Sequence, residues 1–199
     1  MTTDRNVLTA VLLLGAAFMS PACSRSKPAR FFILEPMPPA AESPRGDSGG
    51  LTVGLDAVHI PAYLNRSQLV TRASDVEIGV AEYLRWAEPL ESSVPRMLAE
   101  YLEREAGVGS VSFLPLSFPP EPDRTVSLEL LRFDGARGKT VRLSSRYQIL
   151  DRDRSPLLGP VRSDISVNAE DGSAEALVRA MRQALAELAR ELATALSHS

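Results

Sequence analysis

The amino-acid sequence predicts an α+β fold: a mostly antiparallel or mixed sheet that includes a C-terminal three-strand meander, with two main amphipathic helices packed on one face. Between residues 126 and 169, apolar and polar residues alternate along three consecutive segments, which is the pattern of strands buried on one side. Two other segments repeat apolar residues every three or four positions, as amphipathic helices do. A length of 199 residues fits one domain with N-terminal extensions.

The N-terminus has an apolar run at residues 7–19, behind a short polar head that carries Arg5. Small residues, Ser20 and Ala22, follow it. This layout is typical of a secretory signal peptide, and the run is well short of the ~20 residues that a helix needs to cross a bilayer. A buried helix is the alternative, but Pro21 and the polar stretch after it cannot extend one. We therefore expect residues 1–22 to be an export signal.

Cys23, the only cysteine, follows this run directly. The stretch Ser20-Pro21-Ala22-Cys23 resembles the lipobox of bacterial lipoproteins, in which the cysteine becomes the acylated N-terminus. We therefore expect Cys23 to be the lipid attachment site, anchoring the protein to a membrane without spanning it. By resemblance to known sorting rules, Ser24 implies the outer membrane of a Gram-negative cell. The same spacing also fits an ordinary signal peptidase, which would leave a soluble protein with an unmodified cysteine.

Residues 23–50 are expected to form the lipidated N-terminus and a flexible tether with one short strand near residues 31–34, since residues 35–50 are rich in Pro, Gly and Ser. A single α+β domain then covers residues 51–199. It opens with a strand pattern at residues 51–57 that stops before Pro61. A shorter strand is predicted at residues 68–72, and residues 75–78 turn the chain into a third strand.

A first helix is predicted over residues 90–102, where apolar side chains recur every four positions. Proline in a helix interior costs about 3 kcal/mol, so we expect this helix to start at Ser92 or Ser93 as N-cap or to bend at Pro95. The glycines at positions 107 and 109 resemble a helix stop. They do not indicate a phosphate loop, because they follow a helix instead of opening one.

The meander is predicted from alternating strands at residues 126–130, 141–149 and 161–169, joined by turns. Polar residues on the opposite faces indicate that one side of the sheet is wet or meets a polar partner. Ser173 is the expected N-cap of a final helix. Its apolar stripe should pack on the sheet, and consists of Leu177, Met181, Leu185, Leu188, Leu192 and Leu196.

Composition and motifs argue against several function classes. The net charge is −3 and no basic stripe is present, so nucleic acid is not an expected partner. The histidines are His59 and His198, and the sequence lacks the spaced motifs of serine hydrolases, zinc sites and nucleotide loops. Glu129 and Asp134 lie on a hairpin, where surface charge is expected. We expect no catalytic residues, no metal and no cofactor.

Two stretches, residues 59–64 and 83–90, combine Tyr, Trp, Arg and Pro with apolar residues. Tyr, Trp and Arg dominate binding hot spots. The competing interpretation is that the tyrosine and the tryptophan fill the core. The candidate partner-binding residues are His59, Pro61, Tyr63, Arg72, Arg85 and Trp86.

These stretches carry a family resemblance. A lipobox, then Phe-Phe-Ile-Leu, then VHIPAYLNRSQLVTR at residues 58–72 and RWAEPL at residues 85–90 resemble the ABC-type transport auxiliary lipoproteins, the PqiC-like family. The resemblance runs from Phe31 to the last helix. It implies a non-enzymatic lipoprotein that faces the periplasm and docks an MCE-type, tunnel-forming protein of an envelope lipid transporter to the outer membrane, as a monomer or a homo-oligomer. Two alternatives are a structural or cell-wall-associated envelope lipoprotein and a secreted hydrolase that depends on His59.

Overall fold

The computed structural model describes residues 27–36, 49–115 and 121–199. The predicted signal peptide, Cys23 and most of the predicted tether lie outside the described residues. Within the described ranges, neither helix is both long enough and apolar enough to span a membrane.

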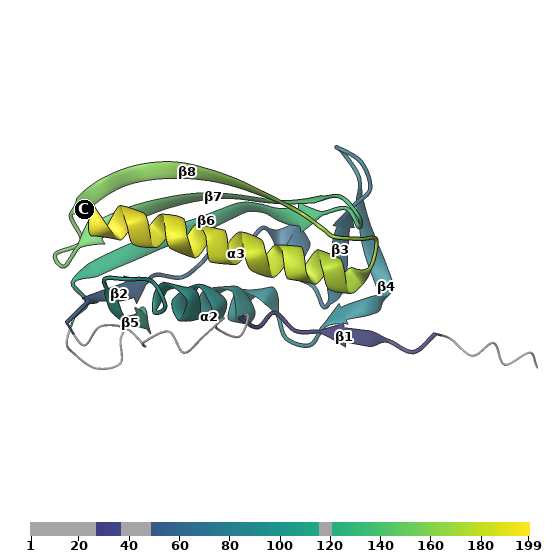
Figure 1. Ribbon diagram of the computed structural model, residues 1–199, viewed down its shortest axis with the longest axis horizontal. Coiled ribbons are helices and arrows are strands. Elements are labelled where there is room, and N and C mark those ends of the chain that lie inside the picture. Colours follow the sequence, from purple (N-terminus) through teal and green to yellow (C-terminus); the bar gives the residue numbers. More distant parts are fainter. Residues whose placement is uncertain (1–26, 37–48, 116–120) are drawn as a thin grey trace, which may run out of the picture.

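Two sheets and two α-helices form the described part of the chain (Figure 1). The larger sheet has the strand order β5-β2-β6-β7-β8, and the smaller has the order β1-β4-β3. Strands β6, β7 and β8 pair antiparallel, while β2 runs parallel to both β5 and β6. The α+β class and the meander are confirmed. The strands are β1 Arg30–Phe32, β2 Leu51–Leu55, β3 Gln68–Arg72, β4 Ile78–Trp86, β5 Val108–Phe113, β6 Arg124–Gly135, β7 Thr140–Asp151 and β8 Pro156–Asn168.

Helix α3, Ala174–Ser197, lies along one face of the meander, with α2, Leu90–Leu102, beside it (Figure 1). The Ser173 hydroxyl oxygen accepts a hydrogen bond from the Ala176 N–H at 3.1 Å, which confirms the N-cap. The leucines of the predicted stripe are at most 2% exposed. Burying one such side chain contributes about 1.5–3 kcal/mol, so this stripe accounts for the position of α3 on the sheet.

The predicted helix over residues 90–102 is confirmed, but the expected N-cap at Ser92 or Ser93 is wrong. The helix begins at Leu90, directly after Pro89, and runs through Pro95, so neither Ser92 nor Ser93 is its N-cap. The Ser93 side chain is buried instead, and its hydroxyl donates to the Pro89 carbonyl at 3.4 Å. Packing explains why the proline is tolerated: the α2 residues Val94, Met97, Leu98 and Leu102 are fully buried, and their burial outweighs a cost of about 3 kcal/mol.

Packed structure begins before residue 51. Strand β1 pairs in parallel with the last residues of β4, with Phe32 opposite Trp86, and Leu34 is fully buried in the core. Arg30 forms an ion pair with Glu175 in the first turn of α3. The N-terminal segment therefore joins the domain near the N-terminus of α3, toward the end of the molecule opposite the C-terminus (Figure 1).

Candidate partner-docking site

Two of the six candidate residues, Tyr63 and Arg72, meet at the carboxylate of Asp134. The Tyr63 hydroxyl donates to Asp134 Oδ2 at 2.7 Å, and Arg72 donates to the same oxygen at 2.5 Å. Arg132 Nε donates to Oδ1 at 3.0 Å. Asp134 is 0% exposed, so the expectation that it is a surface charge is wrong. We call these four residues the Asp134 cluster.

Electrostatics keep this carboxylate ionised. Burial by itself would raise the pKa of Asp134, but hydrogen bonds from Arg72 and Tyr63 and the charges of Arg132 and Arg72 outweigh it and hold the pKa below its usual value. Burial and the hydrogen bond to the carboxylate raise the pKa of Tyr63 to about 12. The cluster joins the 3₁₀ turn η1, Ala62–Leu64, and strand β3 to strand β6, and so fastens the small sheet to the large one.

The structure does not bring the other four candidates to this cluster. Trp86 is only 5% exposed, which fits the core-packing interpretation. Arg85 is half-buried and stands opposite Gln68 of β3 and Phe31 of β1. Pro61 is half-buried at the start of η1. His59 is exposed and lies beside β6.

His59 lines a groove of about 620 Å³. One wall is the chain segment of residues 55–60, the other is the first half of α2, and Phe113 and Leu114 close one end. Phe113 is 51% exposed, which is unusual for a large aromatic side chain. The groove is lined by Leu55, Asp56, Ala57, Val58, His59, Ile60, Glu91, Ser92, Pro95, Arg96, Phe113 and Leu114.

The groove follows from the different lengths of two neighbouring segments. β5 ends at Phe113, opposite Leu55, but the chain after Leu55 continues along β6. The Asp56 N–H donates to the Val126 carbonyl at 2.9 Å, and the His59 N–H donates to the Leu128 carbonyl at 3.2 Å. Residues 56–60 therefore have β6 on one side and the groove on the other.

Charges around the groove are largely engaged with neighbours. Asp56 pairs with Arg154 at 3.0 Å, Arg96 pairs with Glu88, and Glu91 accepts a hydrogen bond from Asn65 at 2.9 Å. The stretch from residue 88 to residue 105, which includes α2, holds five glutamates and two arginines, a net charge of −3. Of these charged residues, Glu91 and Arg96 line the groove, and Arg96 is neutralised by Glu88, so Glu91 is the carboxylate that the helix presents to the groove.

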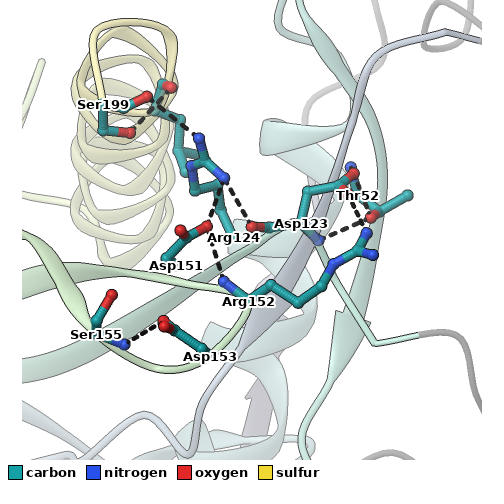
Figure 2. A network of polar contacts seen from close by, with 9 residues as sticks. Thr52, Asp123, Arg124, Asp151, Arg152, Asp153, Ser155 and Ser199 are labelled. Atoms are coloured by element: carbon teal, nitrogen blue, oxygen red, sulfur yellow. Dashed lines mark hydrogen bonds and ion pairs between the residues drawn. The ribbon is translucent and has the colours of Figure 1, made fainter.

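A second hollow, also of about 620 Å³, lies beside the turn between β7 and β8 and is lined mainly by charged side chains and prolines. Figure 2 shows the polar network next to it. Asp123 Oδ2 accepts from the Thr52 hydroxyl at 2.7 Å, and Arg152 donates to Asp123 Oδ1 at 2.5 Å. The hydrogen bonds from Thr52 lower the pKa of Asp123 to about 2. Since these polar groups pair with one another, the network links β2, the residue before β6 and the turn after β7.

Sequence reasoning missed the groove because β5 was not predicted. Its sequence, VGSVSF, is short, contains a glycine and has no charged residue to mark a solvent face. The feature of the sequence that could have indicated the groove is Phe113, an aromatic residue directly before a proline-rich stretch. In the part of the chain that the structure describes, no group of three or more His, Cys, Asp or Glu side chains could hold a metal ion.

Comparison with known proteins identifies related chains. A family model described as ABC-type transport auxiliary lipoprotein component matches residues 32–193. Among curated proteins, none matches this sequence.

Two solved structures share the fold, and a third is less similar. The crystal structure of an uncharacterized protein is 17% identical, with a TM-score of 0.67, and the match covers 85% of this chain and 99% of that chain. Protein XCC0632 from Xanthomonas campestris is 14% identical, with a TM-score of 0.63, covering 83% and 93%. A PelC dodecamer from Paraburkholderia phytofirmans is 10% identical, with a TM-score of 0.44, covering 71% and 87%.

Proposed function

This chain belongs to the ABC-type transport auxiliary lipoprotein component family, and from that premise we propose that it is a non-enzymatic adaptor of an envelope lipid transporter. In this proposal, acylated Cys23 holds the domain on the outer membrane, facing the periplasm. The groove between residues 55–60 and α2 then docks the MCE-type periplasmic protein of the transporter. The single observation that carries the docking role is this open groove with a half-exposed Phe113 at its end.

The position of β1 supports the anchor. Strand β1 begins at Arg30, seven residues after Cys23, and an extended chain of that length spans about 25 Å at 3.3–3.6 Å per residue. Several acyl chains on one cysteine hold a protein on a membrane where a single chain would do so only marginally. An anchored domain would therefore work close to the bilayer surface.

The composition of the groove supports binding over catalysis. Its histidine, His59, is exposed, and the neighbouring charged groups Asp56 and Arg96 are already in ion pairs. A general acid or base needs a positioned partner of matched pKa beside the reacting atoms. Apolar side chains such as Val58, Ile60 and Phe113 make up much of the lining, and these suit recognition of another chain.

Two measurements test the proposal together. Mass spectrometry of the N-terminal peptide of the mature protein should find an acylated Cys23, and the protein extracted from membranes should co-purify with the MCE-type protein of the same transport system. A Cys23→Ala variant should leave the membrane fraction. An unmodified Cys23 on a freely soluble protein, without an MCE-type companion, would contradict both parts. Light scattering of the purified protein would establish whether it is a monomer or a homo-oligomer.

A further inference from the structure

We propose that the groove takes an extended, basic segment of the periplasmic partner as an added β-strand beside residues 56–60. This inference rests on the proposed function, because the partner is the protein that the adaptor docks.

The backbone at the sheet edge beside the groove has groups that β6 does not use. Asp56 and His59 use their N–H groups on β6, while the backbones of Val58 and Ile60 make no hydrogen bond within the described part of the chain. Backbone donors and acceptors are almost always paired, and an extended segment laid along a sheet edge supplies such partners.

Strand β5 pairs in parallel with residues 51–55 and ends where the groove begins. None of the described residues pairs with the same edge between Leu114, whose N–H donates to the Leu55 carbonyl, and the start of η1. A strand laid there would continue the line of β5. Its alternate side chains would contact Val58, Pro95 and Phe113, which line the groove.

Charge on the helix wall of the groove comes from Glu91 and Arg96. Arg96 is paired with Glu88, whereas Glu91 is exposed and accepts a hydrogen bond from the neutral side chain of Asn65. A lysine or arginine of the partner segment would complement the Glu91 carboxylate, and complementary charge steers association and fixes register.

The test measures binding of the purified MCE-type periplasmic protein of the same system to the mature lipoprotein and its variants. Phe113→Lys should weaken binding at least about tenfold, since it removes an apolar contact and repels a basic segment. The matched control is Leu157→Lys, because Leu157 is 41% exposed on β8, the strand at the other edge of the sheet. It should change the dissociation constant less than about twofold. Thermal unfolding of both variants checks that they fold.

A second variant and an exchange measurement examine charge and strand pairing separately. Glu91→Lys should weaken binding severalfold and reduce its sensitivity to salt. Amide hydrogen exchange at Val58 and Ile60 should slow at least about tenfold when the partner binds. Equal affinities for the Phe113 and Leu157 variants, or unchanged exchange at both Val58 and Ile60, would overturn the proposal. So would loss of self-association in Phe113→Lys, which would make the occupant a second copy. If the wild-type protein fails to bind the partner at all, the proposed function itself falls.

Discussion

Replacing Asp134 by asparagine should destabilise the fold much more than removing an exposed carboxylate such as Asp164. The substitution keeps the size of the side chain but leaves Arg72 and Arg132, whose side chains are 22% and 31% exposed, without their carboxylate. Breaking a buried ion pair from one side costs about 3–5 kcal/mol. Since both guanidinium groups keep partial access to water, we expect the lower end, about 3 kcal/mol. That is a large fraction of the roughly 5–15 kcal/mol of a typical domain.

Urea denaturation of the mature protein and of the Asp134→Asn variant measures this loss. A decrease of about 3 kcal/mol should lower Tm by about 6–12 °C in a domain of this size. Asp164→Asn is the control, since Asp164 also pairs with an arginine, Arg162 at 2.8 Å, but both side chains are more than half exposed. We expect little change in its unfolding free energy because exposed pairs contribute little. If both variants lose the same free energy, the Asp134 cluster does not fasten the two sheets.

Three further predictions concern pH and capping. The folded-state pKa of Asp123 is about 2 and that of Asp134 is lowered, so both carboxylates stabilise the fold above their unfolded pKa near 3.9. The free energy of unfolding should therefore fall as the pH drops from about 4 toward 2. Circular dichroism in moderate urea would detect this loss. The pKa of Tyr63 is raised to about 12, so the stabilisation of the fold by its protonated hydroxyl is fully present below about pH 10 and should be lost between about pH 10 and 12. Tyr63→Phe should remove this alkaline loss of stability. Ser173→Ala should cost about 1 kcal/mol in the same denaturation assay, because the Ala176 N–H loses its acceptor, whereas Ser173→Asp should retain stability.

The parts of the fold that the sequence predicted well are long and strongly periodic. Helix α3 spans 24 residues, and the three strands of the meander have 12 or 13 residues each, so their apolar faces repeat often enough to be recognised. β5 has six residues and no such repeat. Helix α2 covers the predicted residues 90–102, but the expected N-cap at Ser92 or Ser93 was wrong, because capping statistics favour serine while in the fold the burial of Leu90 and Val94 decides where the helix begins.

The location of Asp134 could not be predicted for a different reason. Alternation along β6 indicates which face a side chain occupies, but it gives no information on whether another sheet covers that face. The cover comes from η1 and β3, whose Tyr63 and Arg72 are separated from Asp134 by 71 and 62 positions in the sequence. Contacts of that range depend on the path of the whole chain, which local patterns do not specify.

The Asp134 cluster also explains why we propose binding at residues 58–60, directly before the turn that carries Tyr63. Tyr63 and Arg72 are used within the fold, so the motif at residues 58–72 divides into a part that fastens the turn and a part that faces the groove. The groove wall at residues 55–60 ends directly at η1, which Tyr63 ties to β6. Weakening that tie should therefore loosen the wall as well as the small sheet. If the proposed docking holds, stability of the cluster and affinity for the partner are coupled through a few residues of backbone, with no contact required between Asp134 and the partner.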